Sequence, residues 1–409
     1  MAVFPLPLAD LLGHWGSYSV YALVGLAFGF VLESAGFGNS KLLAAQFYFR
    51  DMRVFKVMFT AIITAMTLVF LASAAGWLDY NLVWVPPTYL WPGIVGGLIM
   101  GVGFIIGGFC PGTSLVGAAT GKLDALFFVG GALFGIFLFG ETVSSFDVFF
   151  ESSYMGRFTL PQWLGVSYGT VVIGVVLMAL VMFGVSERVE ARVNRRPVAV
   201  LPRWAPVAAV ALIALAVVNA SMGQPTSQDR WNAISDEQQV LIDERRVYIS
   251  PQELLSLIGD AHIKAVLLDV RVERDYNQFH ILDARRHAPE EIEAVAGELM
   301  FEPANTVFVV MGNGEAAATG AWKTLRAESL PNVYILEGGV NHWIDTFADD
   351  VFRLANAVPD AAEDQLSWRF PAATGARHPA AEPNPYINLA FEPKVKLEIK
   401  RAPTGGGCG

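Results

Sequence analysis

Six apolar stretches fill the first 222 residues, and no other feature constrains the fold as strongly. Each approaches the ~20 residues that a helix needs to cross a bilayer. Glycine is dense in them, as in GIVGGLIMGVGFIIGG, and small residues let membrane helices pack closely. As buried helices of a soluble protein they would leave too little polar surface. We therefore predict an α-helical polytopic membrane domain over residues 1–222, with about six transmembrane helices near residues 17–36, 54–76, 88–110, 122–141, 162–185 and 204–222.

The charges of the connecting loops predict how these spans are oriented. Two loops are basic, after the first and fifth spans, whereas LDYNLVWVPP has no basic residue and residues 142–161 have only Arg157. Basic loops remain in the cytoplasm. The N-terminal MAVFPLPLADLLGHWG has no basic residue and does not resemble a secretory signal. We therefore expect a multi-pass protein of a bacterial inner membrane, with residues 223–409 in the periplasm.

The second half of the chain has the pattern of a soluble α/β domain. Residues 1–222 carry a net charge of +1 and residues 223–409 a net charge of −11. A polar linker is predicted over 223–247. From 248 to 350, buried strands such as KAVLLDV and TVFVVM alternate with helices, which predicts a parallel sheet covered on both faces. Residues 351–409 read as an extended C-terminal tail, in which KVKLEIK could add an edge strand.

Composition excludes several kinds of function. Neither half has the basic stripe that nucleic-acid binding requires, so we expect no nucleic-acid partner. The chain has two cysteines, Cys110 and Cys408, which cannot form a disulfide framework and do not form a CxxC pair. We accordingly predict no metal site and no cofactor.

Cys110 lies where a membrane segment is interrupted, in GGFCPGTS. Pro111 and Gly112 break the helix beside the thiol, and broken backbone at membrane depth is tolerated where it is buried in protein or lines a cavity. The following half-helix would present free N–H groups that favour anions, together with the hydroxyls of Thr113 and Ser114. This pattern suits a sulfur-containing anion. A cysteine that merely packs as a small hydrophobe is the alternative, and a re-entrant hairpin at this point stays open.

Two segments of the membrane half resemble the YeeE/YedE sulfur-transport family, in its half-length form. They are residues 28–66, which include AGFGNSK, and residues 107–141, which begin GGFCPGTS. The resemblance implies that Cys110 lines a path for thiosulfate. Gly38 occupies the place where a second thiol is expected, so a complete path would need a second copy or a paired half-length subunit. Glu33 lies within the first span, and we expect it to form a structural ion pair with Lys41 or Lys56 or to lie at the water interface. A role in transport is the alternative.

Residues 267–289 and 332–343 resemble the rhodanese signature. The first segment contains Asp269, Arg271 and His280, and the second is NVYILEGGVNHW. The resemblance implies a rhodanese-like domain whose active loop follows TVFVVM, with a cysteine at the strand's end. Met311 stands there instead, and a thioether cannot form a persulfide. The degenerate loop comprises Met311, Gly312, Asn313, Gly314 and Glu315.

Two interpretations of the degenerate loop remain. The domain is a docking module, or its loop accepts a thiol from elsewhere. The resemblance also implies an arginine in this loop, which is missing. Glu315 and Ala316 occupy that region, and the charge of Glu315 would repel thiosulfate. We therefore predict no sulfurtransferase activity for this domain, and we name no catalytic residue.

Cys408 stands near the C-terminus in GGGCG, which is similar to the tip of the carrier protein of bacterial thiosulfate oxidation. That resemblance implies a swinging arm that holds sulfur covalently. The sequence thus predicts a membrane protein for uptake or handling of thiosulfate or a related sulfur compound. Its expected partners are the bilayer, a sulfur-containing anion, a second copy or half-length subunit, and periplasmic sulfur carriers. The alternatives are a non-transporting scaffold that docks such carriers and a sulfurtransferase that uses Cys408.

Overall fold

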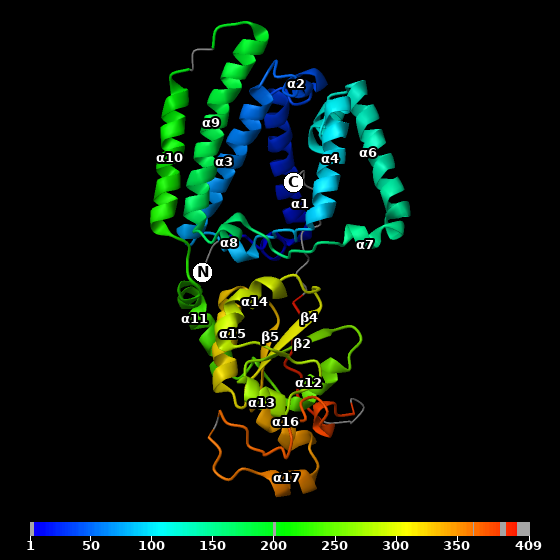
Figure 1. The fold of residues 1–409 in the computed structure, drawn as a ribbon, viewed down its shortest axis with the longest axis vertical. Helices are drawn as coiled ribbons and strands as arrows, with labels where there is room; N and C mark the ends of the chain where they lie inside the picture. The colour runs from blue at the N-terminus through cyan, green and yellow to red at the C-terminus, as the bar shows by residue number, and fades with distance from the viewer. Residues whose placement is uncertain (1–3, 199–201, 363, 385–389, 399–409) are drawn as a thin grey trace. The chain divides into compact units, whose positions relative to one another are not determined.

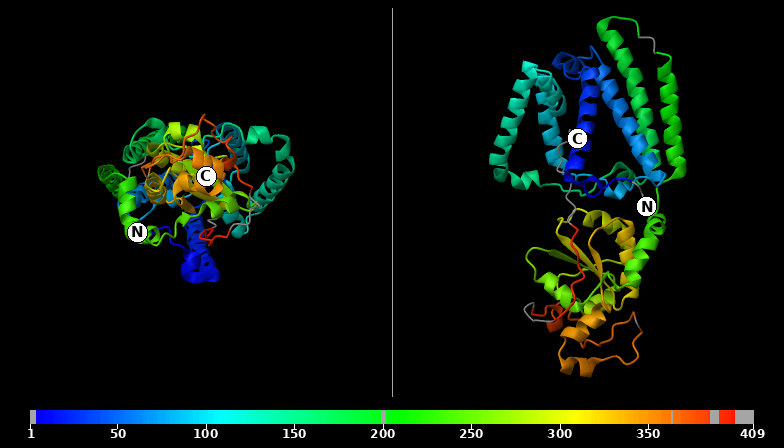
Figure 2. Two further views of the ribbon diagram at one scale, coloured as in Figure 1. Left: turned by 90° about the horizontal axis from the view of Figure 1, so that it is seen from below. Right: turned by 180° about the vertical axis from the view of Figure 1, so that it is seen from behind.

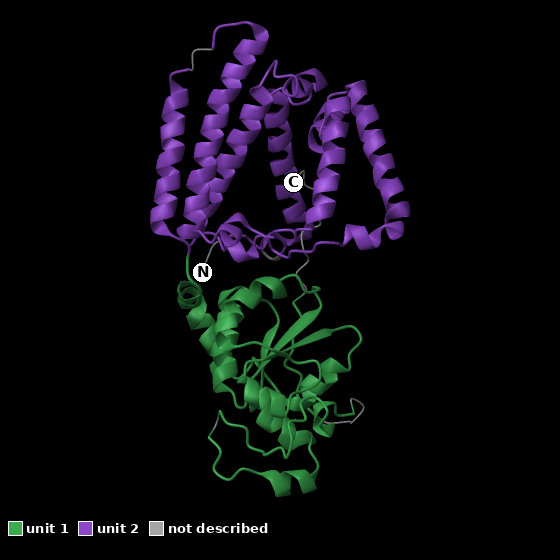
Figure 3. Cartoon of the chain, viewed as in Figure 1, with its two compact units in different colours: residues 1, 225–404 green, residues 2–224, 405–409 purple. Residues whose placement is uncertain are grey.

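The computed structural model describes residues 4–198, 202–362, 364–384 and 390–398. These residues fall into two compact units that divide between Gln224 and Pro225 (Figure 3). The first unit consists of long helices, and the second is an α/β domain with a parallel sheet. Each unit is described separately below.

The described part of the first unit contains six helices that are long and apolar enough to cross a membrane. They are α1 (Leu8–Ser34), α3 (Arg53–Ala74), α4 (Leu90–Gly107), which continues through a break into α5 (Pro111–Ala119), α6 (Leu123–Thr142), α9 (Tyr168–Asn194) and α10 (Trp204–Met222). Short helices connect them: α2 (Ser40–Ala45), α7 (Asp147–Phe150) and α8 (Leu160–Leu164). The prediction of about six transmembrane helices is confirmed.

The long helices form two groups within their layer. Figures 1 and 2 show α3, α9 and α10 side by side, and they share a core of Ile63, Val172, Val176, Ala179 and Ala216. In the second group, α4, α5 and α6 pack beside α1 and α2. The most apolar windows of α1 and α6 are only 6% buried within the chain. Their exposed leucine, valine and phenylalanine side chains match the hydrocarbon of a bilayer rather than water.

The two ends of this helical layer differ in charge. Figure 1 shows α2 and the connection between α9 and α10 at one end, and α7 and α8 at the other. The first end carries the basic loops after the first and fifth spans. At the second end, residues 75–89 and 142–167 contain one basic residue, Arg157. The two basic loops therefore lie on the same side of the layer. This agrees with the positive-inside rule, by which basic loops face the same compartment.

The segment predicted as a polar linker, residues 223–247, instead contains a helix, α11 (Ser227–Asp243). Thr226 and Asp229 form a reciprocal capping box at its start. Trp231, Leu241 and Ile242 pack against the core of the α/β unit. The linker prediction was wrong here, because three apolar residues at helical spacing are sufficient to dock a helix even when most of its sequence is polar.

The second unit is built on a five-stranded, all-parallel sheet in the order β1-β5-β4-β2-β3. Its strands are β1 (Tyr248–Ile249), β2 (Lys264–Asp269), β3 (Arg285–Arg286), β4 (Thr306–Met311) and β5 (Val333–Leu336). Its helices are α12 (Pro251–Ile258), α13 (Glu273–Gln278), α14 (Ile292–Leu299), α15 (Ala316–Ala327), α16 (Gly339–Phe347) and α17 (Asp350–Asn356). The predicted α/β class is confirmed.

The sheet is buried on both faces, which explains its continuous apolar strands. Every residue of β4 is buried, in the pattern that central parallel strands require. Alternate residues of the strands contribute to two cores. One core includes Val309 and Met311 and packs on α12 and α16, and the other includes Phe308 and Val310 and packs on α14 and α15. The active loop of a rhodanese would follow β4, at the centre of this sheet.

The C-terminal segment is bound to the α/β unit rather than extended away from it. Glu253 Oε1 accepts hydrogen bonds from the N–H groups of Lys394 (2.7 Å) and Val395 (2.8 Å). The Tyr334 hydroxyl accepts from Lys396 N–H (2.9 Å), and the Asn332 side chain makes two hydrogen bonds with the backbone of Glu398. Side chains of the α/β unit, and not the backbone of a neighbouring strand, thus hold this segment in place. The described residues 390–398 form no strand, so the predicted edge strand is not seen there.

Candidate functional site

Cys110 is the N-cap residue of α5, at the break between α4 and α5. α4 ends at Gly107, Gly108 turns the chain with a φ of +72°, and Pro111 occupies the first position of α5. The Thr113 N–H donates to Cys110 Sγ at 3.4 Å, and Cys110 N–H donates to Thr113 Oγ1 at 3.0 Å. The sulfur therefore takes the role that serine or threonine oxygen usually has at a helix start.

The Cys110 thiol is half-buried, whereas Thr113 and Ser114 are buried. The Thr113 hydroxyl lies 3.2 Å from Sγ, and the Ser114 hydroxyl donates back to Pro111 O at 2.8 Å. Both hydroxyls therefore support the turn as well as lying near the thiol. The positive end of the α5 dipole would stabilise a negative charge that develops on this sulfur.

The Gly38 turn packs directly against the Cys110 turn. A Cβ atom on Gly108 would lie 3.0 Å from Ser40 O, and one on Gly117 would lie 3.4 Å from Gly38 O. Ser40 Oγ also donates to Asp124 Oδ2 at 2.7 Å, at the start of α6. Phe37, Leu43, Phe109 and Ala125 form a small core between the turns. The structure thus brings together the two segments that the sequence comparison selected, which lie about 70 residues apart.

Glu33 forms an ion pair with Lys122, with Oε1 and Nζ 3.7 Å apart. The predicted partners, Lys41 and Lys56, were wrong. Lys56 instead lies 2.5 Å from Glu187 on α9. A Cβ on Gly38 would lie 2.4 Å from Glu33 Oε2 and 2.9 Å from Lys122 Nζ, so Gly38 leaves the space that this pair occupies. A thiol at position 38 would therefore compete with the pair for the same space.

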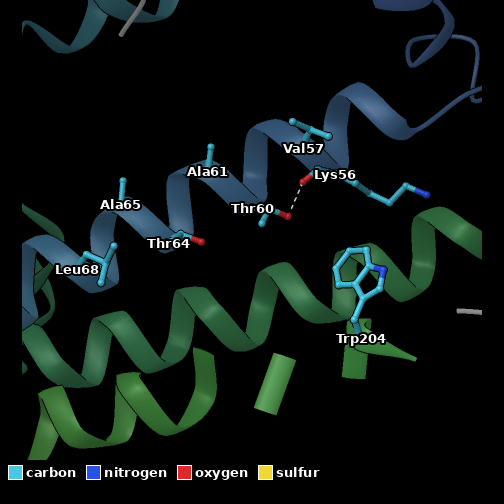
Figure 4. A pocket seen from close by; sticks show the side chains of 8 residues that line it. All are labelled: Lys56, Val57, Thr60, Ala61, Thr64, Ala65, Leu68 and Trp204. Atoms are coloured by element: carbon cyan, nitrogen blue, oxygen red, sulfur yellow. Dashed lines mark hydrogen bonds between the residues drawn. The ribbon is translucent and has the colours of Figure 1, made fainter. Parts of the chain in front are cut away.

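A shallow groove of about 630 Å³ runs along α3 (Figure 4). Small side chains line it, namely Thr60, Ala61, Thr64 and Ala65, and Trp204 of α10 closes one end. Thr60 Oγ1 donates to Lys56 O at 2.7 Å, so its hydroxyl is occupied within its own helix. None of the lining residues belongs to the Cys110 turn. A lipid chain or another helix fits such a surface better than an anion does.

In the α/β unit, Met311 ends β4 with its side chain fully buried in the core that includes Phe279 and Trp343. The loop after it turns its carbonyls toward α16: Val340 N–H donates to Gly312 O (2.9 Å) and Asn341 N–H to Asn313 O (3.1 Å). Gly339, with a φ of +63°, makes this approach feasible. A Cβ there would lie 2.5 to 2.6 Å from the carbonyl oxygens of residues 312, 313 and 314.

Glu315 forms a bidentate ion pair with Arg245, which also contacts Glu337. Arg245 Nη1 and Nη2 donate to the Glu315 carboxylate at 3.0 and 2.7 Å, and Gly338 N–H donates to it at 2.8 Å. Burial raises the pKa of Glu315, but the hydrogen bonds from Arg245 and Gly338 outweigh it and hold that pKa below its ordinary value. Sequence reasoning missed Arg245, which lies before β1 and carries no motif.

The signature residues Asp269 and Arg271 form a buried ion pair with a 2.6 Å contact. Arg271 also donates to Phe279 O (2.7 Å) and Asn313 Oδ1 (3.3 Å), so the pair reaches the degenerate loop. His280 stacks on Tyr276 and lies 2.9 Å from its carbonyl oxygen. These residues hold segments of the domain together. None of them meets Met311 in an arrangement that could activate a nucleophile.

The C-terminal segment also crosses the degenerate loop. Asn313 Nδ2 donates to Asp364 O at 2.9 Å, Asn341 Nδ2 donates to Gln365 O at 2.8 Å, and Ser367 N–H donates to Asn341 Oδ1 at 2.9 Å. Residues 364–367 therefore lie against the loop and against the start of α16. Cys408, the predicted sulfur carrier, lies outside the described residues.

Comparison with known families gave two matches. The family described as sulphur transport matches residues 34–233, which include the Gly38 and Cys110 turns, and the rhodanese-like domain matches residues 250–346. Neither a curated protein nor a solved structure matched the chain. The first match runs from the end of α1 into α11 and so covers most of the helical unit, and the second lies within the α/β unit. The chain therefore joins a helical membrane unit that matches the sulphur transport (YeeE/YedE) family to an α/β unit that matches the rhodanese-like domain.

Proposed function

We propose that the membrane domain takes up thiosulfate or a related sulfur anion through the turn at Cys110. The observation that carries this proposal is the position of the thiol, half-buried at the start of α5 and hydrogen-bonded to Thr113. A polarisable sulfur beside helix-terminal N–H groups is suited to brief contact with a sulfur-containing anion. The path would comprise Cys110, Pro111, Gly112, Thr113 and Ser114, with Gly38 on the facing turn.

A complete path requires a second copy of this chain or another half-length subunit. The facing turn offers Gly38 instead of a thiol, so one chain supplies one pore thiol among its described residues. The nearly unburied apolar faces of α1 and α6 leave ample surface for such a subunit within the bilayer. The assembly would lie in a bacterial inner membrane, with the rhodanese-like domain in the periplasm, because both basic loops belong on the cytoplasmic side.

The rhodanese-like domain serves in this proposal as a docking module for periplasmic sulfur-carrier proteins. Met311 is buried, Glu315 is engaged by Arg245, and residues 364–367 lie on the loop, so the domain has no nucleophile of its own at this place. Cys408 would carry sulfur for transfer between the partners. The same closed loop supports the second candidate, a scaffold that docks carriers without transporting anything.

Uptake of labelled thiosulfate separates the two candidates. Cells that lack other importers would express the full chain with Cys110→Ser, Cys110→Ala or the control Ser19→Ala, which alters an exposed hydroxyl of α1. The transport proposal expects both Cys110 variants to lose uptake at normal protein abundance, with serine no better than alanine, and the control to retain it. Normal uptake in Cys110→Ser would remove the thiol from the mechanism and favour the scaffold.

A further inference from the structure

Arg157, in the connection between α7 and α8, has an unpaired hydrogen-bonding edge. Its side chain is half-buried, and both Nε and Nη2 are buried without a hydrogen-bond partner among the described residues. Arginine stays ionised in proteins, and burying an uncompensated charge is costly. The Nε–Nη2 edge is one that donates two parallel hydrogen bonds to the oxygens of an anion. An acceptor from outside the chain would complete this site.

The backbone around Arg157 is held in place by the loop that precedes α4. Thr88 N–H donates to Gly156 O, and Met155 N–H donates to Thr88 O, both at 2.9 Å. Tyr89 and Tyr154 form an antiparallel bridge, and Gly156 turns the chain with a φ of +60°. The guanidinium lies over the Tyr80 ring, with Cζ 5.1 Å from the ring centroid. The guanidinium is thus positioned by pairing and stacking before any ligand arrives.

The distribution of charge at the end of the helical layer that carries α7 and α8 also points to Arg157. It is the one basic residue in residues 75–89 and 142–167, which contain Asp79, Asp147 and Glu151. One of these carboxylates, Asp79, accepts a hydrogen bond from Asn81 N–H at 3.0 Å. Within these two described segments, an approaching anion therefore meets mostly acidic side chains and one cation, which makes Arg157 the point of attraction.

We propose that Arg157 binds a small oxoanion of the sulfate and thiosulfate class at the end of the membrane domain opposite the basic loops. Nε and Nη2 would each donate to one oxygen, and Tyr80 would support the guanidinium from beneath. The choice of a sulfur oxoanion rests on the proposed function. A lipid phosphate offers the same oxygen chemistry, so the experiment must separate a free anion from a headgroup.

Thermal unfolding of the purified full-length chain in a maltoside detergent, which carries no phosphate, provides the test. The probes are sodium sulfate and sodium thiosulfate, compared with sodium chloride at equal ionic strength, and phosphatidylglycerol in a separate titration. We expect saturable stabilisation by both sulfur oxoanions, and an apparent affinity roughly 10- to 100-fold weaker in Arg157→Gln. That loss corresponds to one charge-assisted hydrogen bond, because the glutamine amide can still donate the other. Arg196→Gln, at an exposed arginine between α9 and α10, should behave as wild type.

Arg157→Lys keeps the charge but loses the two-donor edge, and it serves if the glutamine variant does not fold. Intermediate affinity in Arg157→Lys supports the proposal. Equal sulfate affinity in wild type and the Arg157 variants would overturn it, as would stabilisation by phosphatidylglycerol with no response to free anions. Because binding is measured on purified protein, a wild-type chain that binds sulfate but shows no uptake keeps this inference and contradicts only the transport proposal.

Discussion

The guanidinium of Arg245 donates two hydrogen bonds to the carboxylate of Glu315, 70 residues further along the chain, at 3.0 and 2.7 Å. Glu315 belongs to the loop that would cradle the sulfur of an active rhodanese. The ion pair therefore holds that loop against the segment before β1. The Glu315 carboxylate also accepts a hydrogen bond from the N–H of Gly338, just before α16. The loop therefore connects the segment before β1 to the start of α16 and has a structural role in the domain.

The Arg245–Glu315 pair makes stability depend on pH. The pKa of Glu315 is lowered in the folded state, so the stabilisation is complete above its ordinary value of 4.5 and is lost as the pH falls through the lower folded value. Glu315→Gln should destabilise the protein by about 1 kcal/mol at pH 7, since the pair is partly exposed. Urea unfolding should show this difference in the free energy of unfolding shrinking below about pH 4.

Glu244→Gln, in an exposed pair with Arg246, is the control and should change the free energy of unfolding little. A difference for Glu315→Gln that persists unchanged in acid would contradict the ion-pair account.

Met311→Cys should not restore sulfurtransferase activity. The Met311 side chain is fully buried in the core of the sheet, so a cysteine there would face Phe279 and Trp343 rather than a substrate. The smaller side chain should also leave a cavity and destabilise the domain by about 1–3 kcal/mol. Thiosulfate–cyanide turnover and thermal unfolding of the full-length variant test both statements. Robust turnover in the variant but not in wild type would refute the first statement, and an unchanged unfolding temperature would refute the second.

Gly339→Ala should be strongly destabilising. The new Cβ would lie 2.5 to 2.6 Å from three backbone oxygens, and the residue has a φ of +63°. We expect a loss of at least about 2 kcal/mol, because backbone atoms cannot move aside as a flexible side chain can. Gly320→Ala is the matched control, since nothing lies within 4 Å of its Cβ position in α15. The control should be neutral or stabilising by up to about 1 kcal/mol. Equal effects at the two positions would show that α16 does not close over the loop.

Gly117→Ala should disturb the contact between the Cys110 and Gly38 turns. A Cβ at Gly117 would lie 2.7 Å from the Cβ of Ala125 and 3.3 Å from the Phe109 ring. The detergent-purified variant should unfold at a lower temperature than wild type, whereas Gly101→Ala on α4 should not, since its Cβ position has no neighbour within 4 Å. If both variants unfold like wild type, the two turns do not pack as described.

Local patterns in the sequence were sufficient for most of the architecture. The six spans follow from apolar length, and β2, β4 and β5 follow from short apolar runs between helices, because both signals lie within one element. α11 was missed since most of its residues are polar. Its Thr226–Asp229 capping box is a local signal of a helix start, which the polar composition of the segment obscures.

Features that depend on distant contacts could not be read in this way. The Glu33–Lys122 pair joins residues 89 positions apart, and the nearer lysines offered more obvious partners. Met311 was placed correctly at the end of its strand, but only the fold shows that its side chain enters the core. Arg157 could be noted as an isolated basic residue, whereas its unpaired edge depends on how two loops pair.

The hydrogen bonds between the backbone of residues 394–398 and the side chains of Glu253, Tyr334 and Asn332 have a kinetic consequence for the C-terminus. Ten peptide units join Glu398 to Cys408, so the thiol stays within roughly 36 Å of Glu398. If Cys408 carries sulfur as we propose, a carrier docked within that radius would meet the thiol at an effective concentration in the millimolar range, whatever the amount of protein in the cell. Encounter would then be set by tether length rather than by diffusion between separate molecules.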